Sequence, residues 1–116
     1  MRLPNAKNAV VDIEKLRNYC LNPDHPEGKH KARVFREKLG FTDKDAERLR
    51  QLILEAILTT EATEQDRTVY GQRFVVDFPV RVDEQLSFVL SWVTIRSAWI
   101  IKDGEEFARL TTCFIR

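Results

Sequence analysis

The hydrophobic periodicity of the chain changes once, near residue 60, and this change constrains the fold more than any other feature. Before it, Leu49, Ile53 and neighbouring apolar residues recur at the spacing of an amphipathic helix. After it, Phe74 and Val76 alternate with mostly polar residues, as in a half-buried strand. A chain of 116 residues can bury one compact core but not two. We therefore expect a single α+β domain over residues 1–116, with about three N-terminal helices followed by a three- or four-stranded antiparallel sheet.

Each expected helix has its own boundary signals. Asn22-Pro23 ends the first helix, because the residue before proline avoids the α region. Gly40 caps the second helix, and Thr42 provides the N-cap of the third. The expected ranges are Val11–Leu21, Glu27 or Gly28 to Leu39, and Thr42 to about Thr60.

Three β segments follow: Tyr70–Phe78, Leu86–Ile101 and Phe107–Ile115. Pro79 ends the first segment or places it at an edge of the sheet. A turn is expected at Asp83-Glu84. The segment after it is too long for a typical strand, so we expect a bent hairpin arm or two strands broken near Ser91. Lys102–Glu105 is a hairpin signal.

Composition excludes several classes of protein. The net charge of +1 is too small to give the protein an overall positive field that would attract nucleic acids. The charge is unevenly distributed, however, since residues 1–38 carry nine Lys/Arg against five Asp/Glu. Cys20 and Cys113 lack metal-ligand spacing, so we expect buried free thiols, no metal and no cofactor. The sequence has no long apolar run and no signal-peptide pattern, which predicts a cytoplasmic protein without a membrane span.

The junction between the first two helices concentrates the residues that could handle phosphate, because it holds both histidines and several basic side chains. A helical wheel places Ala32, Phe35 and Leu39 on the core side, His30, Arg33 and Glu37 on the opposite side, and Lys31 on the border. The polar side is either simply solvated or a basic face of a cleft. His25 is either bonded to nearby backbone or a general base.

The predicted sheet adds a second set of polar residues. Thr94, Arg96 and Ala98 share one face of their strand, and Ser97 and Trp99 share the other. Arg96 either pairs with an acid such as Asp77 or binds an anionic ligand, since an unpaired buried arginine is costly. The hydroxyls of Thr111 and Thr112 point in opposite directions on an alternating strand. Tyr70 is either the start of a strand or a hydroxyl that stabilises a phosphorane.

The motifs Leu3-Pro4-Asn5-Ala6, His25-Pro26-x-Gly28-x-x-Lys31-Ala32-x-x-Phe35, Arg96-Ser97-x-Trp99 and Arg109-Leu110-x-Thr112 resemble those of a bacterial domain family of unknown function. Members of that family occur as free-standing small proteins and as the tips of polymorphic toxins. They are similar to the barnase–EndoU–colicin–RelE group of RNases, which shares the order of helices followed by a sheet. The resemblance extends over nearly the whole chain.

The resemblance implies a metal-independent RNase that uses the 2′-hydroxyl of RNA as nucleophile. Carried over to this chain, it implies His25 as general base or acid, Lys31 and Arg96 as phosphate ligands, and Thr112 as an orienting residue. The helical wheel and the strand pattern add four further substrate-binding candidates: His30, Arg33, Tyr70 and Ser97.

Three functional hypotheses follow. The first is an RNase toxin acting on tRNA or mRNA, inhibited by a small acidic antitoxin or immunity protein. The second is a non-catalytic interaction module, such as an antitoxin, immunity or adaptor protein, that uses the same basic groove. The third is a structural domain that forms a homo-oligomer through a sheet surface containing Trp92 and Trp99.

Overall fold

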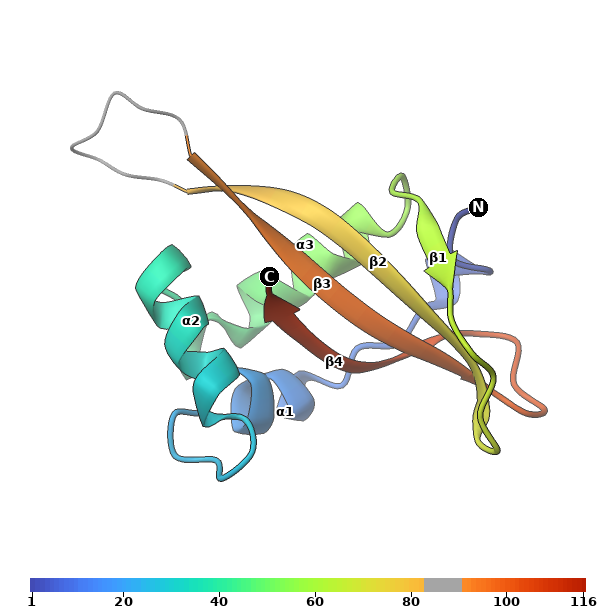
Figure 1. Ribbon diagram of the computed structural model, residues 1–116, viewed down its shortest axis with the longest axis horizontal. Helices are drawn as coiled ribbons and strands as arrows, with labels where there is room; N and C mark the ends of the chain where they lie inside the picture. The colour runs from blue at the N-terminus through green and yellow to red at the C-terminus, as the bar shows by residue number, and fades with distance from the viewer. Residues whose placement is uncertain (83–90) are drawn as a thin grey trace.

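The computed structural model describes residues 1–82 and 91–116 and shows a long twisted sheet flanked by helices (Figure 1). The helical elements are η1 (Ala6–Asn8), α1 (Ile13–Lys15), η2 (Leu16–Cys20), α2 (Lys29–Leu39), η3 (Asp43–Asp45) and α3 (Ala46–Ala56). The strands are β1 (Ala62–Glu64), β2 (Gly71–Val82), β3 (Ser91–Lys102) and β4 (Arg109–Ile115). Helices therefore precede a four-stranded antiparallel sheet, and the predicted α+β class is confirmed.

The first predicted helix is composite. The Asp12 carboxylate accepts a hydrogen bond from the backbone N–H of Glu14 and starts α1, which continues directly into the π-helical turn η2. At the end of η2, Cys20 is fully buried and Tyr19 is half-buried. Neighbouring residues of the π turn thus lie in different environments. Single π-helical turns are frequently found at functional sites.

The second and third helices follow the predicted signals closely. Gly40 adopts a φ of 70°, and the N–H of Phe41 donates to the carbonyl of Phe35, which together close α2 as a glycine C-cap does. Thr42 and Asp45 form a reciprocal capping box that opens η3 and leads into α3. The predicted apolar stripe of α3 is buried, as Leu49 and Ile53 are both fully buried.

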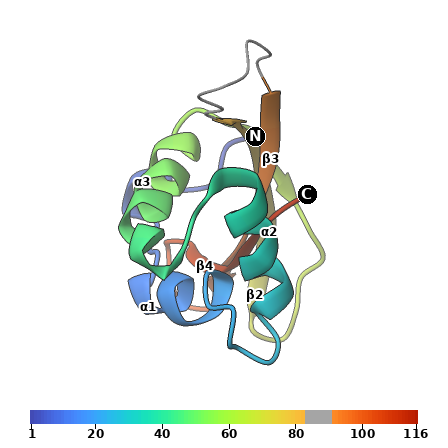
Figure 2. The ribbon, with the colours of Figure 1, turned by 90° about the vertical axis from the view of Figure 1, so that its left-hand side faces the viewer.

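The sheet has the simple order β1-β2-β3-β4, and every neighbouring pair is antiparallel. Figure 2 shows α1 and α3 on one side of the sheet, with α2 beside its edge. The face toward these helices carries the core residues Phe74, Val76, Phe78, Ile95, Trp99, Leu110, Cys113 and Ile115. The opposite face, which we name the open face, carries Asp77, Thr94, Arg96, Ala98, Thr112 and Phe114 by register.

Two details of the strands differ from the expectations. The short strand β1 was not predicted, and β2 continues through Pro79 to Val82 instead of ending there. Proline is tolerated because β1 pairs only with residues 74–76, so β2 is an edge strand at Pro79. Over Ser91–Lys102, β3 is one continuous strand. The predicted Asp83-Glu84 turn and the start of the Leu86–Ile101 segment lie outside the described residues.

The last hairpin contains a β-bulge that determines which residues of β4 lie on the open face. The predicted turn is confirmed, with Gly104 at a φ of 85° and the N–H of Glu105 donating to the carbonyl of Lys102. The pairing of β3 with β4 is interrupted by a bulge, because Ala98 opposes Thr112 while Trp99 opposes Leu110. Thr111 is the extra residue, so Thr112 lies on the open face although Leu110 faces the core.

The third hypothesis assumed a surface that the fold does not form. Trp92 is 60% exposed, whereas Trp99 is 1% exposed and belongs to the core. The two residues are seven positions apart on one alternating strand, so they lie on opposite faces of the sheet. A surface shared by both tryptophans was therefore a wrong expectation, while the oligomeric state itself stays a prediction.

Candidate functional site

Lys31 is the centre of the cluster that the fold assembles. Its ammonium group donates to the hydroxyl oxygen of Thr112 at 2.9 Å and to that of Tyr19 at 3.3 Å. The three side chains come from α2, β4 and η2, elements that lie side by side at the edge of the sheet (Figures 1 and 2). The border position of Lys31 on the helical wheel therefore directs it toward β4 and away from bulk solvent.

Aromatic rings and hydroxyls surround the ammonium group of Lys31, and no described carboxylate neutralises it. The ammonium nitrogen lies 4.9 Å from the ring centre of Tyr19 and 5.7 Å from that of Phe114, within the range of cation–π attraction. Across residues 1–82 and 91–116, no carboxylate oxygen lies within 4.0 Å of this nitrogen. The positive charge thus lies among hydroxyls and aromatic rings.

The two hydroxyls add hydrogen-bond donors to that charge. Tyr19 and Thr112 accept from Lys31 through their oxygens, so each retains its own proton to donate, and the Thr112 hydroxyl also lies within reach of the Cys20 sulfur. An anion placed against the cluster can therefore receive an N–H from Lys31 and an O–H from each neighbour. Convergent donors around one cation are the arrangement that binds a phosphate oxygen and stabilises charge that develops on it.

His25 lies next to this cluster but is held by the backbone. Its Nδ1 accepts hydrogen bonds from the N–H groups of Glu27 and Gly28, both at 3.0 Å. These bonds assign the proton of the neutral ring to Nε2. The ring packs edge-on against Tyr19, with ring centres 4.7 Å apart. Of the two predicted alternatives for His25, the hydrogen bonds to nearby backbone are the one observed, and they leave Nε2–H as the donor of the neutral ring.

Gly28 explains why the predicted motif needs a glycine after the His-Pro pair. A Cβ atom at this position would lie 2.2 Å from the backbone oxygen of Tyr19. Only glycine allows the start of α2 to approach η2 this closely. The close approach keeps His25, Tyr19 and Lys31 in one cluster.

Arg96 lies on the open face and is paired. Its Nε and Nη2 atoms donate to the two carboxylate oxygens of Asp77 at 2.8 and 2.9 Å, and Arg116 donates to the same carboxylate at 2.8 Å. The hydrogen bonds from Arg96 lower the pKa of Asp77, and the charge of Arg116 adds to this effect. Of the two predicted alternatives, the salt bridge with Asp77 is the one observed. By register Arg96 opposes Phe114 and so lies next to the Lys31 cluster on the open face.

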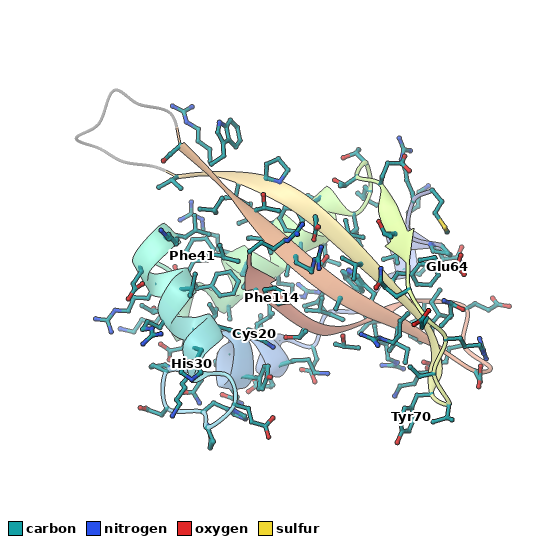
Figure 3. All side chains as sticks on the ribbon, in the orientation of Figure 1. Cys20, His30, Phe41, Glu64, Tyr70 and Phe114 are labelled. Atoms are coloured by element: carbon teal, nitrogen blue, oxygen red, sulfur yellow. The ribbon has the colours of Figure 1, made fainter. Side chains whose placement is uncertain are left out.

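Ser97 and Tyr70 lie apart from Lys31. The Ser97 hydroxyl is fully buried, donates to the carbonyl of Val76 at 2.8 Å and accepts from the Trp99 indole at 2.9 Å. Its hydrogen bonds are those of a core residue. Tyr70 is 74% exposed and lies at the far end of the sheet from Cys20 and Phe114, as Figure 3 shows.

His30 and Arg33 are exposed and lie on the side of α2 that faces away from β4. Both line a groove of about 710 Å³ between α2 and its flanking segments. The structure therefore brings His25, Lys31, Thr112 and Arg96 to one region and places His30 and Arg33 in another.

Two residues of this region were not predicted as part of a site. The only sequence signal for Tyr19 is its place in the first predicted helix, directly before Cys20 and close to the Asn22-Pro23 helix end. Cys20 lies beneath Thr112, with its sulfur 3.9 Å from the hydroxyl oxygen. A hydrogen bond from the Cys113 thiol lowers the pKa of Cys20, while that same interaction together with burial raises the pKa of Cys113. Both thiols are free and buried, as predicted.

The described residues contain neither a group of three His, Cys, Asp or Glu side chains suited to a metal ion nor a helix long and apolar enough to cross a membrane. The fold and the cluster thus define a small α+β domain with a cluster of one ammonium and two hydroxyl groups beside the open face of its sheet. The chain belongs to a family known as a domain of unknown function, DUF6883, whose model matches residues 2–116. Neither the curated proteins nor the solved structures contain a match.

Proposed function

We propose that this protein is a metal-independent endoribonuclease that binds the scissile phosphate of RNA at Lys31. The observation that supports this most strongly is the ammonium group held between Tyr19 and Thr112 without a carboxylate partner among the described residues. The order of helices followed by an antiparallel sheet agrees with the resemblance to the barnase–EndoU–colicin–RelE group. In this proposal the enzyme is the toxin of a toxin–antitoxin or toxin–immunity pair, with tRNA or mRNA as its target.

The proposed reaction is an internal transesterification. The 2′-oxygen forms a bond to phosphorus and the bond to the 5′-oxygen breaks, which leaves a 2′,3′-cyclic phosphate and a 5′-hydroxyl. Water takes the proton of the 2′-hydroxyl, and Lys31 gives one to the departing 5′-oxygen. Lys31 then regains a proton from solvent. The O–H groups of Tyr19 and Thr112 hold the phosphoryl oxygens as negative charge builds on them.

The geometry assigns His25 and Arg96 supporting roles in this proposal. The Nδ1 atom of His25 is already an acceptor for two backbone N–H groups, so its ring offers an Nε2–H donor to phosphate and not a free base. Arg96 donates two of its five N–H groups to Asp77, and the remaining N–H groups can contact the RNA backbone. Both residues therefore bind and orient, while Lys31 carries the charge compensation.

The test is cleavage of a labelled single-stranded RNA by the purified protein in the presence of EDTA. We expect products that end in a 2′,3′-cyclic phosphate, and no cleavage where the 2′-hydroxyl is replaced by hydrogen. Lys31→Met should lower the rate at least a hundredfold, whereas Lys38→Met, on the exposed side of the same helix, should keep it. Equal rates for the two variants, or no cleavage of any RNA by the natural sequence, would contradict the proposal.

A second candidate function is a non-catalytic interaction module. It is favoured by the pairing of Arg96 with Asp77 and by the occupied Nδ1 of His25, since neither group is free for proton transfer. Expression in a bacterial host separates the two candidates. Growth arrest that Lys31→Met abolishes supports the nuclease, and a stable complex with a partner protein without any RNA cleavage supports the module.

A further inference from the structure

The side of α2 that faces away from β4 forms a groove that the proposed nuclease does not use. The groove has a volume of about 710 Å³, and Leu21, Pro23 and Phe41 contribute to its apolar floor. Lys29 lines it, whereas Lys31, two positions on and therefore about 200° around the helix, does not. The groove and the Lys31 cluster thus lie on opposite flanks of one helix.

Three cations form a stripe along this groove, which His30 and one acidic residue, Asp43, also line. Lys29, Arg33 and Arg36 stand at positions i, i+4 and i+7 of α2 and so share one side of the helix. All three are exposed, and across the described part of the chain none has a carboxylate within 4.0 Å. Like charges at this spacing repel and lower helix stability. The stripe therefore lowers the stability of α2 in the free protein. Together with the apolar floor, it is complementary to a partner that carries negative charges next to an apolar side chain.

We infer that this groove binds an acidic amphipathic helix of a partner protein. The stripe extends over about 10 Å at 1.5 Å per residue, so carboxylates at i, i+4 and i+7 of a partner helix would face the three cations. An apolar side chain next to them would enter the floor beside Phe41, as in other helix-in-groove complexes. The inference stands independently of the proposed nuclease activity.

An acidic helix fits the floor of the groove better than single-stranded RNA does. Binding of RNA without sequence preference relies on exposed aromatic faces on which bases stack. Phe41 is only 4% exposed, and the guanidinium of Arg48 lies 5.3 Å from its ring centre. The floor therefore offers apolar surface but no free aromatic face for stacking.

The test uses a fluorescein-labelled helical peptide with glutamates at i, i+4 and i+7 and leucines at the adjacent positions. Its binding is measured by fluorescence anisotropy. The stripe variant Lys29→Glu/Arg33→Glu/Arg36→Glu should bind at least tenfold more weakly than the natural sequence. The control variant Lys7→Glu/Lys38→Glu/Lys102→Glu makes the same change in net charge at exposed positions outside the groove and should bind within twofold. A scrambled peptide of the same composition should bind at least tenfold more weakly.

Two results would overturn the inference. Equal weakening in the stripe and control variants would show attraction by net charge alone. Displacement of the peptide by a single-stranded RNA that binds tighter through the same three cations would make the groove an RNA site. A triple glutamine variant of the stripe repeats the measurement if charge reversal unfolds α2. Lys31→Met should bind the peptide within twofold, so a failure of the nuclease proposal leaves this result unaffected.

Discussion

Lys31 and Thr112 lie 81 positions apart in the sequence, and a 2.9 Å hydrogen bond joins their side chains across α2 and the last strand. The bond links the two parts of the molecule that the sequence pattern separates, the helical half and the β half. It also fixes the ammonium group of Lys31 at the edge of the open face. One contact therefore contributes both to the stability of the fold and to the proposed chemistry.

Replacing Thr112 by valine should test this link. Valine keeps the β-branched shape but removes the acceptor of the Lys31 hydrogen bond, so we expect a loss of about 1–2 kcal/mol in the free energy of unfolding. The proposed RNA cleavage should fall together with it, because Lys31 loses its fixed position. Urea denaturation and a cleavage assay measure the two effects. Thr111→Val, one residue away and exposed, is the matched control, since it removes only an exposed hydrogen bond to the Ala98 carbonyl and none to Lys31. A larger loss in the control than in Thr112→Val would contradict the assignment.

Ser97→Ala should affect stability and leave cleavage intact. The substitution removes the acceptor of the Trp99 indole and the donor to the Val76 carbonyl inside a fully buried site. Leaving buried polar groups unsatisfied costs about 1–3 kcal/mol. Thermal unfolding should show this loss, and Ser91→Ala at the less buried end of β3 should show little. A drop in cleavage without any loss of stability would restore Ser97 as a substrate-binding residue.

Gly28→Ala should separate η2 from α2. The added methyl group would meet the Tyr19 carbonyl oxygen at 2.2 Å, and this atom belongs to backbone that cannot move freely. Overpacking of this kind costs about 1–3 kcal/mol. The displacement should also weaken the contact of Lys31 with Tyr19, which ¹H–¹⁵N NMR spectra would show as shifts in both elements. The control is Lys29→Ala, one position later and exposed. Its free energy of unfolding should lie within about 0.5 kcal/mol of that of the natural sequence.

The Asp77 pair predicts a pH dependence with a definite sign. Its hydrogen bonds from Arg96 lower the pKa of Asp77 in the folded state below the value of about 3.9 for an unfolded aspartate. The contribution to stability is therefore complete above the unfolded pKa and is lost as the pH falls through the folded pKa. Asp77→Asn should cost up to about 1 kcal/mol at pH 7, and this difference should shrink steadily between about pH 5 and pH 2.

The control for this prediction is Glu47→Gln, whose carboxylate pairs with Arg50 on the exposed surface of α3. It should change the free energy of unfolding much less than Asp77→Asn does at pH 7, because solvent screens an exposed pair. Chemical denaturation at a series of pH values measures both variants. An Asp77→Asn effect that stays constant from pH 7 to pH 2 would show that the charge of Asp77 does not stabilise the fold.

Much of the fold follows from local signals in the sequence. The capping box at Thr42 and the glycine C-cap at Gly40 place α2 and α3, and the alternation around Phe74 and Val76 identifies β2. These signals act over a few residues, so they can be interpreted without tertiary information. Strand β1 has three residues, too few to establish any alternation, and its existence depends on pairing with β2.

The site was only partly predictable, because side-chain partners depend on register. Arg96 had two alternatives, and the choice followed from the position of Asp77 directly opposite on β2. Ser97 and Thr112 both read as strand hydroxyls, yet one is a core hydrogen-bonding group and the other faces Lys31. Helical periodicity placed Lys31 on a border, but no local pattern could show that Tyr19 would receive its second hydrogen bond.

The bulge in β4 changes which alternate residues of the strand face the core. Before Thr111 the even-numbered residues Ala108 and Leu110 face the core, and after it the odd-numbered residues Cys113 and Ile115 do so. Thr111 is therefore the one position of β4 that could be deleted with every other pairing kept. Insertion of a second extra residue after it, with the earlier pairing kept, would place the inserted residue opposite Ala98 and move Thr112 to the core position opposite Ser97, away from Lys31. Gaps in this strand among related sequences thus carry information that substitutions do not, since a single gap decides which chemical group meets the lysine.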